Sequence, residues 1–192
     1  MKVSTVETIP RVLSFDPGLA MCGWSILDHK AGNVIVTRFG TIAPNRLTDL
    51  ANQREQVNHY GRRLISLNFL RDMVIALIEE HKPQYIVAED AYFDPTKPNA
   101  FIALLQWLST VEMLVFKQYG LPLYKIPSKT AKLIVSGNGG CSKDNVQDAL
   151  FAHSDIVFKQ QKQTDKLTSH EADAIAIGYA FLSNILPALV GK

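Results

Sequence analysis

Residues 13–27, LSFDPGLAMCGWSIL, carry the pattern that decides the fold. A short apolar run over residues 11–16 ends on Asp16, and the Pro-Gly pair that follows predicts a turn. Residues 22–28 then predict a second strand and residues 33–42 a third, with a turn between them. Three consecutive strands with short links predict an antiparallel meander.

Helical and extended patterns alternate through the rest of the chain. Apolar residues recur at helical spacing from 47 to 81, Gly61 marks a break or bend in that pattern, and Pro83 ends it. The other predicted elements are a strand over 84–89, a helix over 99–118, a strand over 121–126, helices over 128–135 and 142–152, a loop over 154–169 and a last helix from about 170. This order predicts an α/β fold with a mixed five-stranded sheet, three antiparallel strands followed by strand–helix–strand, flanked by helices.

The composition is that of a soluble globular protein. The 192 residues are 47% hydrophobic and 20% charged with a net charge of +2, which excludes disorder, collagen-like repeats and coiled coil. Neither an internal repeat nor a Gly/Ser-rich linker divides the chain, so we expect a single domain over residues 1–192. Because the net charge is small, binding to an anion must come from local arrangement.

Cysteine content and apolar stretches bear on location. Cys22 and Cys141 are too few for a disulfide framework, so we expect a reducing, cytoplasmic compartment, compatible with a bacterial or phage origin. Residues 1–11 lack the apolar core of a signal peptide. The uncharged stretch over 174–190 is slightly short for a membrane span and is interrupted by polar residues and proline, so we expect a buried helix there.

Three acidic residues stand out by their positions. Asp16 ends the first predicted strand, Glu89 ends the fourth, and Asp173 lies in the first turn of the last helix inside an apolar run. His170 precedes Asp173 by three residues, so both side chains can face one site. A carboxylate beside apolar surface is costly without a partner, and a hard divalent cation is a suitable partner because it takes oxygen ligands.

Each acidic residue also has a simpler interpretation. Asp16 before Pro-Gly can be a turn residue, Glu89 can be the first solvated residue after its strand, with Asp90 as a competitor, and Asp173 can be an acid favoured by the helix dipole. The joint signal is stronger, because the two strand ends and the last helix would converge in this sheet order. Alanines in the last helix would let it lie close to the sheet and bring Asp173 toward the strand ends.

At these positions the sequence resembles the RuvC family of Holliday junction resolvases, within the ribonuclease H-like and retroviral-integrase superfamily. Residues 13–27 resemble the family's first motif, an apolar strand followed by Asp-Pro-Gly, a small residue and an aromatic. The other matching segments are PQYIVAEDAYF at 83–93, the basic segment KTAKLIVSGNGGCSKDNVQ at 129–147 and SHEADAIAIGYA at 169–180. The resemblance covers about residues 11–182 and implies a ribonuclease H-like fold.

The resemblance also implies a nuclease site. Matched residue by residue, it makes Asp16, Glu89, His170 and Asp173 the catalytic set that holds two Mg²⁺ ions, with Mn²⁺ as a substitute. Such a site hydrolyses phosphodiester bonds and leaves a 5′-phosphate and a 3′-hydroxyl. Paired nicks in a four-way junction by a homodimer are the implied activity.

The matched basic segment implies a DNA-contacting surface. Lys132 and Lys143 match residues that the family places near the active site and DNA, with Lys143 counted as catalytic, and Lys129 joins them on this surface. Lysines outnumber aspartates by three between residues 125 and 166, although a solvated face is the simpler interpretation for any one lysine. Tyr92 falls where the family has an aromatic that stacks on junction bases. For Phe93 we expect core packing instead.

The apolar helix predicted over 99–118 bears on assembly. It is apolar on most sides, so one side can pack on the sheet and the other can meet the same helix of a second copy in a two-fold dimer. Full burial within one chain is the alternative interpretation.

The chain departs from the family pattern in two ways. Many members have a second aspartate where His170 stands, and segments 44–60 and 154–169 match poorly. A related nuclease acting on forks, flaps or RNA, a non-catalytic junction-binding protein, and an ATP-binding actin-like or sugar-kinase-like domain therefore stay open as alternatives. The last would need a second phosphate loop and a larger second domain than this chain has room for.

Overall fold

One sheet of six strands, ordered β5-β4-β1-β2-β3-β6, organises the computed structural model, which describes residues 9–47, 53–159 and 166–190. The strands are β1 (Arg11–Asp16), β2 (Cys22–Lys30), β3 (Asn33–Ile42), β4 (Tyr85–Glu89), β5 (Leu123–Ile126) and β6 (Ile156–Phe158). Strands β1, β2 and β3 pair antiparallel, which confirms the predicted meander. Strand β4 joins β1, β5 joins β4 and β6 joins β3 in parallel.

Strand β6 corrects the predicted strand count from five to six. It lies in the segment 154–169, for which the sequence predicts a loop, and residues 160–165 of that segment lie outside the described residues. The strand has only three residues, which pair in parallel with residues 34–36 of β3. Such a short run cannot display the alternation by which strands are recognised in a sequence.

The helices follow the predicted order, but two of the predicted helical stretches are subdivided. They are α1 (Pro44–Leu47), α2 (Arg54–Tyr60), α3 (Arg62–His81), α4 (Pro98–Tyr119), α5 (Ser128–Ser136), α6 (Lys143–Ala152), α7 (Ser169–Ala180), the π-helical turn η2 (Phe181–Ile185) and α8 (Leu186–Val190). The pattern over 47–81 is not one helix, and residues 48–52 within it lie outside the described part of the chain. The predicted break at Gly61 is confirmed: its φ of 84° lies in the left-handed region, where only glycine is free of strain.

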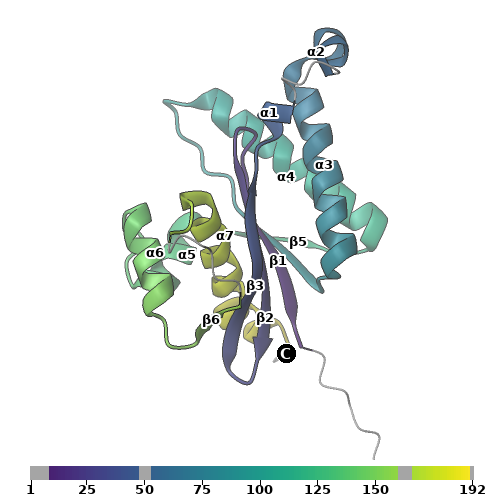
Figure 1. Ribbon diagram of the computed structural model, residues 1–192. Coiled ribbons are helices and arrows are strands. Elements are labelled where there is room, and N and C mark those ends of the chain that lie inside the picture. The colour runs from purple at the N-terminus through teal and green to yellow at the C-terminus, as the bar shows by residue number, and fades with distance from the viewer. Residues whose placement is uncertain (1–8, 48–52, 160–165, 191–192) are drawn as a thin grey trace, which may run out of the picture.

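Two helical layers enclose the sheet (Figure 1). Helices α3 and α4 cover one face, and α5, α6 and α7 cover the other. Alternation along β1 sends Leu13 and Phe15 into the first core, where Phe15 meets Trp107 of α4 edge to face at 5.3 Å, and sends Val12 into the second. Every second residue of β1 therefore faces α7, and Asp16 falls on that side.

Helix α7 lies unusually close to the sheet. The Ser14 Oγ of β1 donates a hydrogen bond of 2.8 Å to the Ala174 carbonyl of α7. A Cβ atom added at Gly23 of β2 would lie 1.9 Å from the His170 carbonyl oxygen, and one at Gly178 would lie 2.4 Å from a Leu27 methyl. The predicted close approach of this helix is confirmed, and glycines on both surfaces make it feasible.

Two helical stretches, Pro98–Tyr119 and Ser169–Leu189, are long and apolar enough by length and composition to cross a membrane. In the second stretch, residues 171–180 of α7 are all buried against the sheet and neighbouring helices. The buried helix expected over 174–190 is therefore confirmed as far as residue 182, whereas residues 187–189 are exposed. The apolar character of the buried part follows from its place in the core.

The contact between β2 and α7 gives a prediction about stability. Gly23→Ala would force the added methyl against backbone atoms of His170, which cannot rotate away. We expect a loss of about 3 kcal/mol, or roughly 6–12 °C in melting temperature, in a thermal denaturation experiment. Gly140→Ala is the control, because its Cβ would meet only the Asn138 Oδ1 at 3.5 Å. Equal melting temperatures for the two variants would contradict the close approach.

Candidate active site

The carboxyl ends of β1 and β4 bring two acidic residues together. The parallel register pairs Phe15 with Ala88, so Asp16 and Glu89, each the next residue along, lie side by side at the sheet edge. Since Phe15 and Ala88 pack under α3 and α4, both carboxylates are on the α7 side of the sheet. This register therefore places Glu89, rather than its neighbour Asp90, beside Asp16.

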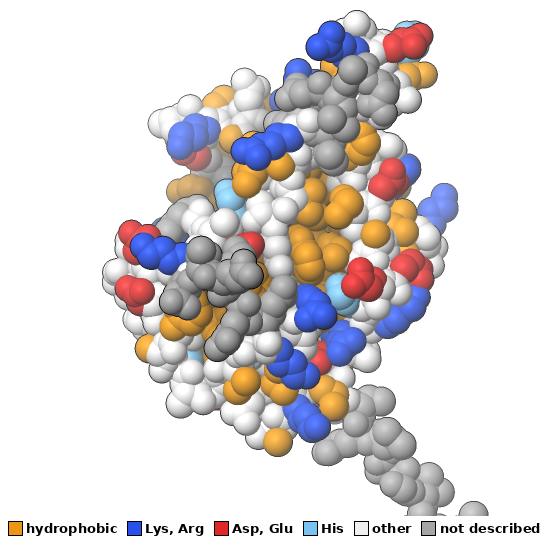
Figure 2. Space-filling model, viewed as in Figure 1, with side chains coloured by type: hydrophobic (Ala, Val, Ile, Leu, Met, Phe, Trp, Pro, Cys, Tyr) orange, Lys and Arg blue, Asp and Glu red, His pale blue; other side chains and the backbone are white. Residues whose placement is uncertain are grey.

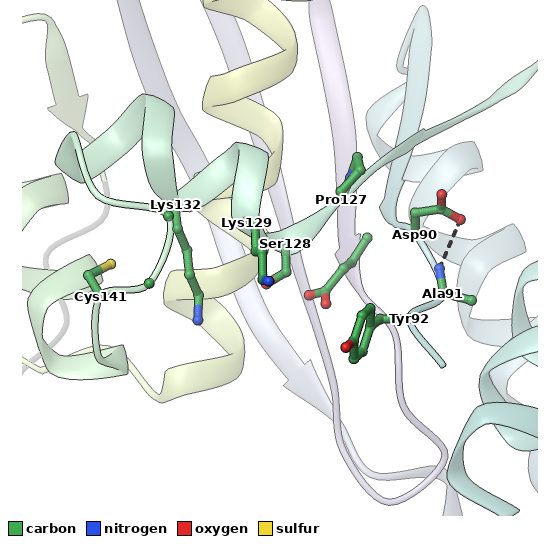
Figure 3. Close-up of a pocket in the computed structure, with 11 residues that line it drawn as sticks. Asp90, Ala91, Tyr92, Pro127, Ser128, Lys129, Lys132 and Cys141 are labelled. Atoms are coloured by element: carbon green, nitrogen blue, oxygen red, sulfur yellow. Dashed lines mark hydrogen bonds between the residues drawn. The ribbon is translucent and has the colours of Figure 1, made fainter. Parts of the chain in front are cut away.

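The Asp90 side chain makes a local hydrogen bond instead. Its Oδ1 accepts a hydrogen bond of 2.8 Å from the backbone N–H of Ala91 (Figure 3). This carboxylate therefore makes a hydrogen bond within its own loop.

The first turns of α7 add two more side chains. Asp173 is 8% exposed, and the His170 Nδ1 lies 2.6 Å from the Asp16 Oδ2. Residues 154 positions apart in the chain are thus in direct contact. The contact with the carboxylate fixes the orientation of the imidazole ring.

A capping box fixes where α7 begins. The Thr168 hydroxyl accepts from the Glu171 N–H at 3.2 Å, and the Glu171 carboxylate accepts from the Thr168 N–H at 2.8 Å. The same Thr168 hydroxyl lies 3.1 Å from the hydroxyl of Thr41, near the end of β3. The helix start is therefore tied to the sheet, which positions His170 and Asp173. Sequence reasoning did not identify the Thr41 contact, which joins residues far apart in the chain.

Burial and the neighbouring carboxylates both act on the pKa of Glu89. Burial first, then the charges of Asp16 and Asp173, raise the pKa of Glu89 to about 7, while a hydrogen bond from Ser128 and the charge of Lys132 act in the opposite direction. The three carboxylates are therefore close enough to repel one another. Within the described ranges, no three His, Cys, Asp or Glu side chains converge into a ready-made metal cage.

A hollow of about 500 Å³ opens beside Glu89 (Figure 3). Tyr92, from the loop after β4, stands on one side, and Lys129 and Lys132, from α5, stand on the other. Tyr92 is 74% exposed, Lys129 is exposed and Lys132 is half-buried. The hollow combines an aromatic ring, lysines and an acidic edge. Ser128, a further lining residue, was not predicted, since hydroxyls at helix starts are common.

Two other residues singled out in the sequence are Lys143 and Phe93. Lys143 is the first residue of α6, where Ser142 caps the helix, but its side chain lies outside what the structure describes. Its catalytic role stays a prediction. The expectation of core packing for Phe93 is wrong: its side chain is 54% exposed and meets Phe101 edge to face at 5.2 Å on the surface.

Fold and site together define a ribonuclease H-like nuclease, with acidic residues at the ends of the first and fourth strands and in a helix packed across them. The family model described as crossover junction endodeoxyribonuclease RuvC matches residues 12–181. The chain belongs to this family of endodeoxyribonucleases.

Similarity to individual relatives supports this family membership. The RuvC of Borrelia turicatae is 26% identical over 169 residues, which cover 88% of this chain and 93% of that protein. The RuvC of Dictyoglomus thermophilum is 30% identical over 136 residues, covering 71% and 77%. Among solved structures, Thermus thermophilus RuvC in complex with a Holliday junction substrate has a TM-score of 0.68 at 17% identity, covering 90% of this chain and 93% of that one. The yeast mitochondrial Holliday junction resolvase Ydc2 has a TM-score of 0.65 at 15% identity, covering 90% and 78%.

Membership of this family implies dependence on a divalent metal. The side chains present fit such an ion, because carboxylate oxygens and an imidazole nitrogen are its usual ligands. The raised pKa of Glu89 is an independent indication, since a cation among Asp16, Glu89 and Asp173 would offset their mutual repulsion.

The repulsion predicts how stability of the metal-free protein depends on pH. A free glutamate titrates near 4.5, whereas Glu89 in the folded chain has a pKa of about 7. Below about pH 4.5 the group is protonated in both states and costs nothing. As pH rises toward 7, only the folded state keeps the proton, so stability falls, and above 7 the full cost remains. Glu89→Gln removes this cost.

We therefore expect chelator-treated Glu89→Gln to be about 1–3 kcal/mol more stable than wild type at pH 8, with the gain disappearing at pH 4. Thermal denaturation across this range measures it. Glu112→Gln, at an exposed carboxylate paired with Lys125, is the control and should give no such gain. A Glu89→Gln variant less stable than wild type at pH 8 would contradict the assigned repulsion.

Proposed function

We propose that this chain resolves four-way DNA junctions as a homodimer, by paired symmetric nicks that leave 5′-phosphate and 3′-hydroxyl ends. The observation that carries the proposal is that Asp16 and Glu89 end neighbouring strands, that the charges of Asp16 and Asp173 act on Glu89, and that Glu89 lies beside a hollow lined by lysines. The names of the RuvC relatives, and a similar fold solved with a Holliday junction, support the substrate class.

The metal-holding residues of the proposed mechanism are Asp16, Glu89 and Asp173, with His170 as a further ligand or as the group that positions water. Two Mg²⁺ ions, or Mn²⁺ in their place, would supply activation of the attacking water and stabilisation of the leaving oxygen. Asp16, at 2.6 Å from the His170 Nδ1, holds the imidazole so that Nε2 is directed away from the carboxylate. In that orientation His170 can accept a proton at Nε2.

The basic residues have a supporting role in this proposal. Lys129 and Lys132 line the hollow beside Glu89 and would contact the phosphates of the cleaved strand. Lys143, at the start of α6, is proposed as a further catalytic lysine on the strength of the family match. Ser128 keeps Glu89 in place through its hydrogen bond.

The central test is a cleavage assay on a mobile four-way junction with and without Mg²⁺, with nicks mapped on all four strands. We expect symmetric paired nicks that require the metal, and at least a 1,000-fold lower rate for Glu89→Gln, on the order of the loss seen when an essential catalytic group is removed. Junction affinity of that variant should stay within about threefold of wild type. Glu112→Gln is the matched control and should cleave normally.

Other substrates in the same assay separate the alternatives. A fork, a flap, a plain duplex and an RNA–DNA hybrid are compared with the junction side by side. If any of these substrates is cleaved faster than the junction, that substrate replaces the junction in the proposal, and the assignment as a nuclease stands. If no substrate is cleaved in a metal-dependent way, a non-catalytic junction-binding protein is the alternative that remains.

Tyr92 is proposed to stack on an unpaired base at the branch point, because its ring is 74% exposed at the edge of the hollow. Tyr92→Ala should lower junction affinity about tenfold or more, equivalent to the 1–3 kcal/mol of one base stack, with melting temperature nearly unchanged. Tyr92→Phe keeps the ring and should bind like wild type. A matching loss in Tyr92→Phe would assign the effect to the hydroxyl and remove stacking from the account.

The homodimer is proposed from the outer surface of α4. That helix buries only four of its residues and exposes Ile102, Leu105, Met113 and Phe116, with 70% of Met113 and 74% of Phe116 accessible. These four recur at helical spacing on one stripe, which contradicts full burial of the helix within one chain. A two-fold axis through this stripe would set two active sites for two symmetric strands.

Light scattering tests the dimer. We expect the mass of two chains for wild type and of one chain for Met113→Glu combined with Phe116→Glu, because two buried charges would destabilise an apolar interface by several kcal/mol. Gln118→Glu, on an exposed side of the same helix, is the matched control and should stay dimeric. If wild type has the mass of one chain at assay concentration, the proposed dimer is ruled out.

Two broader proposals complete this assignment. We take residues 1–192 as a single domain, because both cores pack on the same sheet. A reducing cytoplasm is the proposed compartment, since Cys22 and Cys141 are both buried free thiols.

A further inference from the structure

Helix α2 stands off the end of the molecule. Figure 1 places it beyond α1 and the start of α3, away from both helical layers. None of its seven residues is buried. We call α2 together with the first residues of α3, residues 54–64, the α2 projection.

The α2 projection gains little stability from its own contacts. Its helix has no side chain capping the N-terminus, and Gly61 interrupts the chain before α3. A helix this short is marginal in water without tertiary packing. The exposed residues of this helix are therefore available for an external contact.

The exposed side chains indicate the chemistry of that contact. Arg54, Arg62 and Arg63 are exposed, against the single acidic residue Glu55. Tyr60 is 58% exposed and meets His59 edge to face at 4.4 Å. Figure 2 shows charged and histidine side chains over the outer surface of this end of the molecule. Guanidinium groups suit phosphates because they donate in a planar fork.

The base of the projection is joined to the catalytic edge. Ile42, which pairs with Cys22 after the Asp16 turn, ends β3 two residues before α1 begins. Thr41 lies 3.1 Å from Thr168, the cap of the helix that carries His170 and Asp173. The projection therefore extends from the same end of the sheet as the carboxylates (Figure 1).

We infer that the α2 projection binds the phosphate backbone of a duplex arm of the substrate, outside the bonds that are cut. The inference rests on the proposed function and extends it, because it assigns a second DNA contact that senses the length of the arm. Charge favours DNA over a second copy of this chain, since three arginines from each copy would repel across such an interface.

A binding experiment with junctions of increasing arm length, in chelator to prevent cleavage, tests this contact. Arms run from about 6 to about 20 base pairs, or roughly 20 to 70 Å. Wild-type affinity should rise in a step once the arm reaches the projection. In Arg54→Gln combined with Arg63→Gln the step should be absent, with affinity on the longest arms about tenfold lower and the salt slope reduced by about 2.

Controls separate the inference from simpler effects. Arg71→Gln removes another exposed arginine, paired with Asp72 in α3, and should keep the step. The double variant should cleave saturating junction at the wild-type rate, because neither arginine belongs to the catalytic set.

Three results would overturn the inference. They are an equal loss of affinity on short and long arms, an unchanged step in the double variant, and a change of mass in light scattering that reassigns the surface to contact between copies. If wild type cuts no junction, the proposed function fails separately, and affinity for a plain duplex of about 20 base pairs then decides the inference: equal affinity in wild type and double variant overturns it.

Discussion

Backbone-to-backbone contact between α7 and the sheet is the constraint on which the site depends. Gly23 and Gly178 remove the side chains that would hold the helix away, and Ser14 uses its hydroxyl to hold the Ala174 carbonyl. A helix at ordinary distance from the sheet would leave Asp173 and His170 remote from Asp16. Close approach, rather than any feature of the acidic residues themselves, turns three separated segments into one centre.

That centre is assembled against an electrostatic cost. Burial and two neighbouring carboxylates make ionisation of Glu89 unfavourable, so the metal-free site is a strained arrangement of like charges. The Thr168–Glu171 capping box and the Thr41 contact hold the helix start in spite of this repulsion. Rigid anchoring and repulsion together favour a cation as the group that completes the site.

Much of this could be predicted from the sequence, because it depends on local signals. Alternation and turn residues located the meander, and acidic residues at the ends of apolar runs located Asp16 and Glu89. Strand β6 was not predicted because three residues are too few to show the alternation typical of a strand. Phe93 was misjudged because hydrophobicity alone does not tell whether a loop residue lies inside, and the Thr41–Thr168 contact joins residues 127 positions apart. Contacts of that kind depend on the assembled fold.

The separation of Asp16 and His170 along the chain has a consequence for biosynthesis. A nascent polypeptide that has emerged from the ribosome as far as α6 already has β1 and β4, and so two of the carboxylates, but it lacks the helix that carries His170 and Asp173. The contact between Asp16 and His170 cannot form until α7 has been synthesised, and closing such a long loop makes it a late step in folding.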